Sequence, residues 1–418
     1  MTQHQTYDLA RAIGDRLAHP DTAPPASCGQ PWWAQSLAHG IPGIALLHVE
    51  LAAAGLAPWQ NAHDWLTAAT RTPVTTGPDS HPYYGAPALA HALAVAADYR
   101  PGAYHRALAD LDRNIAIDVR RRLVDAHHRI DQNRLPALAE FDALQGLTGY
   151  GAHLLHRDPA SPLLRDVLDY LVRLTEPITM NGVVLPGWWT SSGPSGRNDQ
   201  WFPDGHVNIG TAHGITGVLN LLSLCARRGT LVHGQHAAIR AICTWLDTWR
   251  TETDRGPAWP YWVTPAEYRS GKTALHPPLR PSWCYGTAGV ARGQQLAALA
   301  LGDTQRQLMA ERALVAALTD QAQLAATVDI SLCHGFAGLA HVAGRAAADA
   351  LPEPATRLLA LIPMLLDSVH PPGRDPEKAV TAILADPERG PGLLDGAVGI
   401  ALAVLPPHTT WDSCLLIA

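Results

Sequence analysis

A short glycine pattern recurs along the whole of this 418-residue sequence and restricts the fold more than any other feature. Each copy reads as a polar residue, then Gly, two further residues and a Gly or Ala, and an apolar stretch rich in Ala and Leu follows it. The copies are His39–Gly43, Tyr84–Ala88, Gln145–Gly149, His213–Gly217, Tyr285–Gly289, His334–Gly338 and Asp395–Gly399. One Gly-x-x-Gly is weak evidence, whereas seven copies in one chain indicate a repeat architecture.

The stretches that follow the glycines predict inner helices. They are apolar nearly all round, as buried helices are, and examples are Ile44–Ala54, Val218–Ala226 and Val290–Leu301. Before each copy lies an amphipathic stretch, which predicts an outer helix. These stretches are Tyr7–Leu17, Trp59–Thr70, Tyr104–His128, Leu163–Leu174, His236–Trp249, Gln305–Ala325 and Ala355–Val369. We therefore expect an all-α ring of seven inner and seven outer helices.

Such a ring needs every repeat to cover its neighbours, so we expect a single domain over residues 1–418. Gly182–Leu185 is at most a short strand. Glycine permits a positive φ and close backbone approach, which suits inner helices that begin together at one end of a ring. The polar residue that opens each copy then faces the mouth of the ring, which predicts a site there.

The charge balance excludes several classes of function. Lys and Arg total 31 against 37 Asp and Glu, a net charge of −6, so no strong positive field is available for nucleic acid. No apolar run is long enough to span a bilayer, and the charged N-terminal residues do not form a signal peptide. The sequence predicts a cytosolic protein. Its six cysteines lack disulfide-scaffold spacing, which leaves buried, reactive or metal-binding roles.

Two cysteines stand in the same position of consecutive copies. Cys284 precedes Tyr285, and Cys333 precedes His334. Since a ring places consecutive repeats side by side, these residues form a Cys₂His set with an open fourth position, which is typical of catalytic zinc. The alternative is that both cysteines are buried fillers and that His334 only caps a helix. Cys28, Cys225, Cys243 and Cys414 lack this register and are interpreted as structural.

Together these motifs resemble the lanthipeptide cyclases, the LanC-like family, over essentially the whole chain. The resemblance depends on the glycine copies, Trp283–Gly286, Cys333–Gly335, Asn208–Gly214 and Leu185–Trp189. It implies an α/α toroid with one zinc per chain, held by Cys284, Cys333 and His334. It also implies that a cysteine thiol of a dehydrated precursor peptide, leader plus core, adds to dehydroalanine or dehydrobutyrine to form a thioether ring. A lanthipeptide dehydratase is the expected partner.

The same resemblance extends to Asp142, His213, Arg280 and Tyr285. Addition of a thiolate leaves an enolate that must gain a proton, and an imidazole titrates near working pH, so His213 is the expected acid. Asp142 would orient His213, Arg280 would stabilise the enolate oxygen, and Tyr285 would hydrogen-bond or supply a proton. As plain structural residues, His213 would cap a helix, Asp142 would serve as an N-cap, and Arg280 would form an ordinary ion pair.

Other interpretations stay open at this stage. Some family members add glutathione to dehydrated residues, and protein prenyltransferases also combine an α/α barrel with zinc and a peptide thiol. A third alternative is a zinc-stabilised scaffold that binds peptide without chemistry. Trp188, Trp189 and Trp201 either pack the loop of residues 180–207 or bind peptide. Family members can carry a β-rich insertion between the second and third copies, which would fall within residues 100–140, although that segment is mostly helical in pattern.

Overall fold

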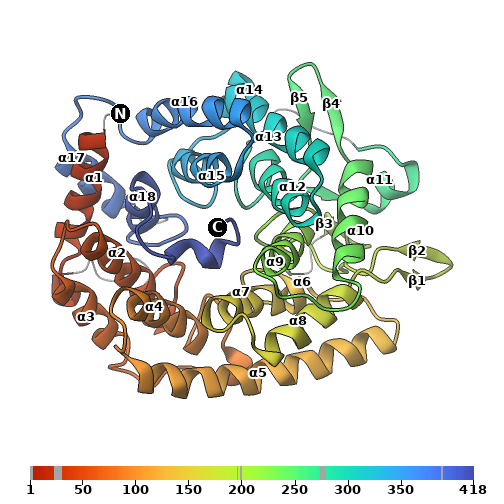
Figure 1. Cartoon of the computed structure of the whole chain (residues 1–418), viewed down its shortest axis with the longest axis horizontal. Helices are drawn as coiled ribbons and strands as arrows, with labels where there is room; N and C mark the ends of the chain where they lie inside the picture. The colour runs from red at the N-terminus through yellow and green to blue at the C-terminus, as the bar shows by residue number, and fades with distance from the viewer. Residues whose placement is uncertain (1–2, 23–30, 195, 198–199, 274–278, 387–388) are drawn as a thin grey trace. The chain divides into compact units, whose positions relative to one another are not determined.

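The computed structural model describes residues 3–22, 31–194, 196–197, 200–273, 279–386 and 389–418. Most of its regular structure is helical (Figure 1). A helix begins directly after the first glycine of every copy of the repeated pattern. These inner helices are α2 (Ile41–Ala53), α4 (Ala86–Tyr99), α7 (Leu147–Arg157), α9 (Ile215–Arg227), α12 (Thr287–Leu301), α15 (Phe336–Asp349) and α18 (Ala397–Val404). The predicted inner helices are confirmed, although α2, α9 and α12 begin three residues before the stretches that were expected to be helical, within the repeated pattern itself.

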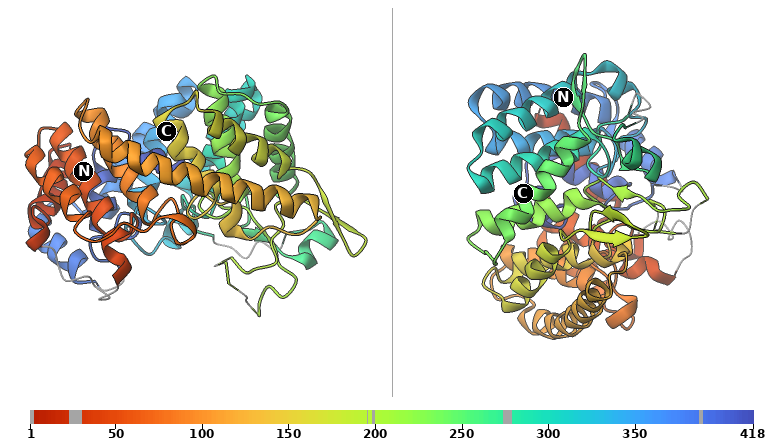
Figure 2. Two further views of the ribbon diagram at one scale, coloured as in Figure 1. Left: turned by 90° about the horizontal axis from the view of Figure 1, so that it is seen from below. Right: turned by 90° about the vertical axis from the view of Figure 1, so that its right-hand side faces the viewer.

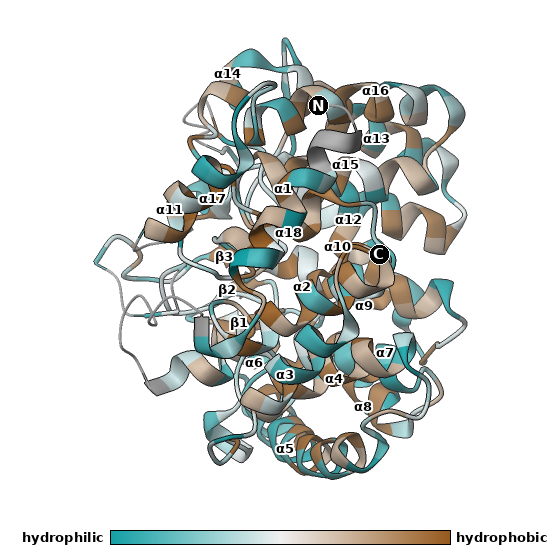
Figure 3. Ribbon diagram, turned by 90° about the vertical axis from the view of Figure 1, so that its left-hand side faces the viewer, coloured by the Kyte–Doolittle hydropathy of each residue, from teal (hydrophilic) through white to brown (hydrophobic). Residues whose placement is uncertain are grey.

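The amphipathic stretches form the outer helices at nearly the predicted bounds. They are α1 (Gln3–Arg16), α3 (Trp59–Ala68), α5 (His105–Asp131), α8 (Pro162–Arg173), α10 (Gln235–Thr248), α13 (Thr304–Thr319) and α16 (Pro352–Val369). Polar and apolar residues alternate on α5 (Figure 3), which buries Leu108, Ile115 and Val119 and exposes Val124. Residues 100–140, all of which the structure describes, contain α5 and α6 (Leu138–Phe141) and no strand.

One outer helix differs from its prediction. The stretch expected to be continuous from Gln305 to Ala325 is divided at Asp320, where α14 (Gln321–Ala325) begins. The Asp320 carboxylate accepts a hydrogen bond from the backbone N–H of Ala322 at 2.9 Å, so a capping side chain starts a new helix there. Two further helices, α11 (Pro265–Ser270) and α17 (Pro376–Ala385), were not expected. Short 3₁₀ turns are η1 (Pro20–Thr22), η2 (Pro31–Gln35), η3 (Gly77–Asp79) and η4 (Trp411–Leu415).

Strands are few and short in the described part of the chain. The expected strand within Gly182–Leu185 is present as β2 (Val183–Leu185), which pairs antiparallel with β1 (Ile178–Met180) in a hairpin that extends away from its neighbouring helices (Figure 2). The other antiparallel pairs are β3 (Val207–Asn208) with β6 (Trp262–Val263) and β4 (Thr251–Thr253) with β5 (Gly256–Ala258). The pairing of β3 with β6 matters most, because β3 leads directly into the copy that opens with His213.

Contacts gather into two compact units. The first unit comprises residues Met1–Ile117, Val328–Gly344 and Leu359–Asp412, and the second comprises Asp118–Thr327, Arg345–Leu358 and Ser413–Ala418. Within the first, α2 packs against α3, α4 and α18, and α1 packs against α17 and α18. Within the second, α12 packs against α9, α10 and α13, and α7 packs against α8 and α9. The single-domain organisation stays a prediction.

The last glycine of a copy packs against the chain that precedes its helix. A Cβ at Gly338 would lie 1.9 Å from the carbonyl oxygen of Leu332, and one at Gly399 would lie 1.8 Å from that of Leu393. The chain thus crosses the first turn of the inner helix at a distance that only glycine permits. At Gly286 the backbone conformation itself favours glycine, because its φ of 116° lies in a region that residues with a side chain rarely adopt.

No helix in the described ranges combines the length and the apolar character needed to cross a membrane.

Candidate functional site

His213 and Asp142 meet in the second unit although 71 residues separate them. His213 Nδ1 lies 2.7 Å from Asp142 Oδ2, and because a carboxylate accepts hydrogen bonds, Nδ1 carries the proton. Asp142 Oδ1 accepts from the backbone N–H groups of Gln145 and Gly146 at 2.6 and 2.8 Å. Asp142 therefore satisfies N–H groups ahead of α7 with one oxygen and holds the imidazole of His213 with the other.

The pairing changes the acidity of His213. Burial lowers the pKa of this imidazole, but the hydrogen bond to Asp142 and the charge of that carboxylate raise it, with a smaller contribution from Cys284. The net result is a pKa above the usual 6.5. An imidazole with a raised pKa holds its proton through neutral pH for longer than an ordinary one, which suits a proton donor.

Tyr285 lies beside His213, with ring centroids 6.4 Å apart. Its hydroxyl accepts a hydrogen bond from Asn208 Nδ2 at 3.0 Å, and Asn208 Oδ1 accepts from the backbone N–H of Gly210. The Thr211 N–H donates to the Cys284 carbonyl at 3.0 Å. The strand residue Asn208 and the loop after it thus run along Cys284 and Tyr285 and position both of them.

Arg280 lies at the edge of the same group. Its carbonyl accepts a hydrogen bond from the hydroxyl of Tyr261 at 3.1 Å, and the rings of Tyr261 and Tyr285 are 5.7 Å apart. Arg280 Nε is buried and has no hydrogen-bond partner among the residues that the structure describes. A buried donor without a hydrogen-bond partner costs folding free energy. Arg280 Nε is therefore a candidate to donate a hydrogen bond to an oxygen of a bound substrate.

Cys333 and His334 belong to the first unit and are anchored there separately. The Cys333 backbone N–H donates to the carbonyl of Leu394 at 2.9 Å. His334 Nε2 lies 3.1 Å from Asp329 Oδ2, and Nδ1 lies 3.6 Å from Asp395 Oδ1. Burial opposes ionisation of Asp329, but hydrogen bonds from His334 and Ser331 outweigh it and hold the pKa of this carboxyl well below its usual range. Asp329 thus orients the imidazole of His334.

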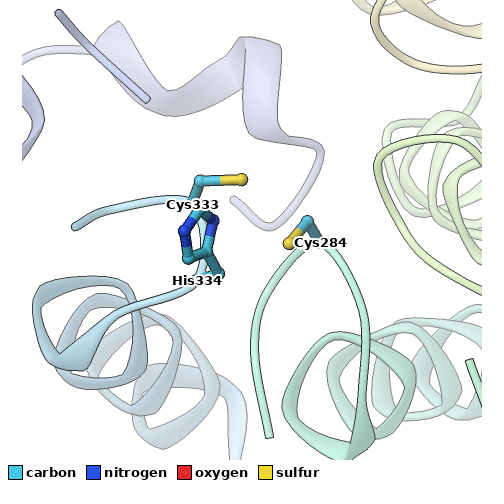
Figure 4. Close-up of side chains that lie close together, drawn as sticks. All are labelled: Cys284, Cys333 and His334. Atoms are coloured by element: carbon cyan, nitrogen blue, oxygen red, sulfur yellow. The ribbon is translucent and has the colours of Figure 1, made fainter. Parts of the chain in front are cut away.

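The predicted metal ligands lie together. The two sulfurs of Cys284 and Cys333 and one imidazole nitrogen of His334 are all within 4.8 Å of one another (Figure 4). A tetrahedral zinc with Zn–S bonds of about 2.3 Å separates two sulfurs by about 3.8 Å, so small side-chain shifts suffice to bring this set around one ion. Two thiols and an imidazole are also the donor types that zinc takes in proteins. The donor set therefore fits a zinc ion.

Cys225 and Cys243 lie outside this donor set. Cys225 and Cys243 are buried, and burial raises the pKa of both thiols to about 12, as expected of structural cysteines. Cys28 lies outside the described residues. Trp188 and Trp189 are buried and pack edge to face against Trp245 and Tyr268, whereas Trp201 is 77% exposed. Packing thus accounts for the first two tryptophans of the loop.

Two orienting residues, Asn208 and Asp329, were not predicted as site residues. Each stands five positions before a histidine that opens a copy, His213 and His334 respectively. Arg280 stands at the same offset before Tyr285. Comparing the copies at this offset could have singled out Asn208 and Asp329. The shared register places them, like Arg280, in the segment that leads into an inner helix.

Comparisons with known proteins identify the family and the fold. Residues 31–416 match the family model described as "Lanthionine synthetase C-like protein". The curated "Nisin biosynthesis protein NisC" of Lactococcus lactis subsp. lactis is 24% identical over 206 residues, which cover 49% of this chain and 48% of that protein. The match thus spans about half the length of this relative. The chain aligns with a solved structure of nisin cyclase with a TM-score of 0.75 and 20% sequence identity. The alignment covers 99% of this chain and 97% of the nisin cyclase chain. This likeness confirms the predicted α/α toroid fold.

Proposed function

Because the chain belongs to the lanthionine synthetase C-like family, we propose that it is a zinc-dependent lanthipeptide cyclase. Its substrate would be a dehydrated precursor peptide, and its product a lanthionine or methyllanthionine thioether ring. The observation that carries the proposal is the donor set of Cys284, Cys333 and His334, whose ligand atoms lie within 4.8 Å of one another. A dehydratase as partner and a cytosolic location stay predictions.

Zinc would be held by Cys284, Cys333 and His334. When bound, it would keep the cysteine thiol of the peptide deprotonated near neutral pH and fixed in position. The contribution of the chain is to arrange these ligands. Nε2 of His334 donates a hydrogen bond to the Asp329 carboxylate, so Nδ1 is the ring nitrogen whose lone pair would bind the metal. The backbone N–H of Thr211 holds the carbonyl of Cys284.

His213 is the proposed proton donor. When the thiolate attacks the β-carbon of dehydroalanine, the carbon–sulfur bond forms, the carbon–carbon π bond breaks, and its electron pair becomes an enolate. A proton delivered to the α-carbon then completes the reaction, which leaves the mass of the peptide unchanged. Asp142 holds His213 Nδ1, so Nε2 is the nitrogen that transfers the proton. The raised pKa of His213 keeps that proton available.

Arg280 and Tyr285 complete the proposed machinery. The unpartnered Nε of Arg280 is a donor suited to the developing enolate oxygen. Tyr285, held by Asn208 beside His213, would hydrogen-bond the peptide or the imidazole. These roles for Asp142, His213, Arg280 and Tyr285 are the ones that the family resemblance implies.

The decisive experiment follows free thiols and mass in one peptide. Purified protein is incubated with a peptide that contains dehydroalanine and a cysteine, and free thiols are then alkylated and measured by mass spectrometry. A cyclase removes the alkylatable thiol at unchanged mass. Addition of glutathione instead increases the mass only when glutathione is supplied, prenylation requires an isoprenoid diphosphate, and a scaffold leaves the thiol untouched. Any of the last three results would replace the proposed function.

A further inference from the structure

A buried stretch of three residues in the second unit, which we call the anchoring segment, comprises residues 415–417. Each of its carbonyl oxygens accepts a hydrogen bond from a side chain of the same unit. The donors are Trp283 Nε1 to Leu415 at 3.1 Å, Asn220 Nδ2 to Leu416 at 3.0 Å, and Arg292 Nε and Nη2 to Ile417 at 3.0 and 2.8 Å. Asn220 and Arg292 belong to the inner helices α9 and α12. Trp283 directly precedes Cys284, so the anchoring segment connects two inner helices with a predicted metal ligand.

Leu416 holds a backbone conformation that leucine rarely adopts. Its φ of 59° lies in the left-handed region, which costs free energy for a residue with a side chain. A conformation of this kind persists only where the surrounding structure imposes it. Here the side chain of Leu416 is buried, and its carbonyl accepts the hydrogen bond from Asn220. The path of the anchoring segment is therefore set by the residues that pack around it.

Cys284 depends on contacts of this kind for its position. It lies outside any helix or strand, in a turn that leads into α12 (Figure 4). The backbone N–H of Ser282 donates to the carbonyl of Tyr285 at 3.0 Å across this turn. The buried indole of Trp283 adds a contact outside the turn, its hydrogen bond to Leu415. The side chain next to the thiol is thus fixed to a segment more than 130 residues further along the chain.

We propose that Trp283 is a positioning residue for the metal site. The anchoring segment holds the indole of Trp283, and the indole holds the turn from which the thiol of Cys284 reaches Cys333 and His334. Contacts that orient the ligands of a metal are commonly worth about 10–100-fold in metal affinity. The inference rests on the proposed function, because it takes these three residues as zinc ligands.

The alternative explanation is that the hydrogen bond of Trp283 only satisfies a buried donor. Trp259 provides the comparison, since it is also fully buried in the second unit and its Nε1 donates to the carbonyl of Leu246 at 3.0 Å. Loss of either hydrogen bond leaves a buried carbonyl without that donor and should destabilise the fold. Only the positioning role predicts that loss of one of them also weakens metal binding.

The test compares Trp283→Phe with Trp259→Phe. Phenylalanine keeps a buried aromatic ring at each position and removes only the N–H donor and part of the ring. Both variants should lower the melting temperature of the metal-free protein. Zinc affinity, measured by competition with a chelator and without any peptide, should fall by about 10–100-fold in Trp283→Phe and stay unchanged in Trp259→Phe.

A second pair of variants leaves Trp283 intact. Asn220→Ala removes the side chain that holds the carbonyl of Leu416, so it should loosen the anchoring segment and weaken zinc binding. Ser223→Ala is the matched control, because Ser223 is buried on the same helix and donates no hydrogen bond to the anchoring segment. It should bind zinc as the original protein does.

The outcomes separate this inference from the proposed function. Equal zinc affinity in Trp283→Phe and Trp259→Phe would overturn the inference and leave the proposed function standing. The same holds if Ser223→Ala weakens zinc binding as much as Asn220→Ala does. Absence of zinc binding in the original protein would overturn both the inference and the proposed function.

Discussion

Asp142 divides its two carboxylate oxygens between two tasks: Oδ2 accepts a hydrogen bond from His213 at 2.7 Å, and Oδ1 accepts from the backbone ahead of α7. The carboxyl is almost fully buried, with its side chain 2% exposed. The orientation of the proposed proton donor is therefore tied to the start of a neighbouring inner helix.

The first prediction concerns the pKa of His213. Asp142→Asn keeps a carbonyl oxygen for the backbone N–H groups but removes the charge that His213 faces, so the pKa of His213 should fall. NMR titration measures this directly, and His206, whose pKa burial lowers to about 4, is an internal control that should not move. Cyclisation near neutral pH should slow by at least about tenfold. An unchanged pKa of His213 would show that the pair does not control its acidity.

The same variant should change how stability depends on pH. A histidine whose pKa is raised by folding contributes stability that is complete below the unfolded pKa, 6.5, and is lost as the pH rises through the folded value. The loss of stability in Asp142→Asn should therefore be larger at pH values below about 6.5 than at alkaline pH. Denaturant unfolding at both ends of this range provides the comparison.

The second prediction separates metal binding from proton transfer. The protein should contain about one zinc per chain, and Cys333→Ala should lose zinc and ring closure together, because two ligands do not hold the ion firmly. His213→Ala should keep its zinc while the rate falls by roughly 10²–10⁴-fold. Cys225→Ala removes a buried cysteine outside the donor set and should keep both. Metal analysis and thiol alkylation measure each variant, and loss of zinc from His213→Ala would make His213 a ligand instead.

The third prediction tests the orientation of His334. Asp329→Asn removes the charge that its imidazole faces, and zinc affinity should fall by about 10–100-fold, as measured by competition with a chelator. Asp375→Asn is the matched control in the same unit, since the Asp375 carboxylate caps α17 through the Glu377 N–H. Equal zinc affinity in the two variants would show that Asp329 does not orient His334 for metal binding.

The fourth prediction uses two glycines of one helix, α15. Gly338→Ala would place Cβ 1.9 Å from the Leu332 carbonyl oxygen and should destabilise the protein by about 1–3 kcal/mol. At Gly344 the nearest atom outside the helix backbone, Ile362 Cδ1, would lie 3.9 Å away. Gly344→Ala should therefore be neutral or stabilise by up to about 1 kcal/mol, because alanine favours the helix. Chemical denaturation of both variants tests whether close packing, rather than helix propensity, requires Gly338.

Local patterns in the sequence were sufficient for the inner and outer helices of the repeats, but not for α11 and α17. The start of each inner helix follows from its glycine copy, and the outer helices follow from amphipathic spacing, since both signals depend on neighbouring residues. The division at Asp320 was missed because a capping carboxylate competed with a continuous amphipathic pattern. The grouping of Cys284, Cys333 and His334 could also be predicted, because repeats in register bring equivalent positions together.

Tertiary structure decided the relationships that no local pattern contains. The pairing of Val207–Asn208 with Trp262–Val263 sets Asn208 beside Tyr285, and two strands so short and so distant in sequence carry no periodic signal. Sequence alone determined which residues could bind metal or transfer a proton. Only folding determined that His213 faces Asp142, because this contact joins two residues that lie 71 positions apart in the chain.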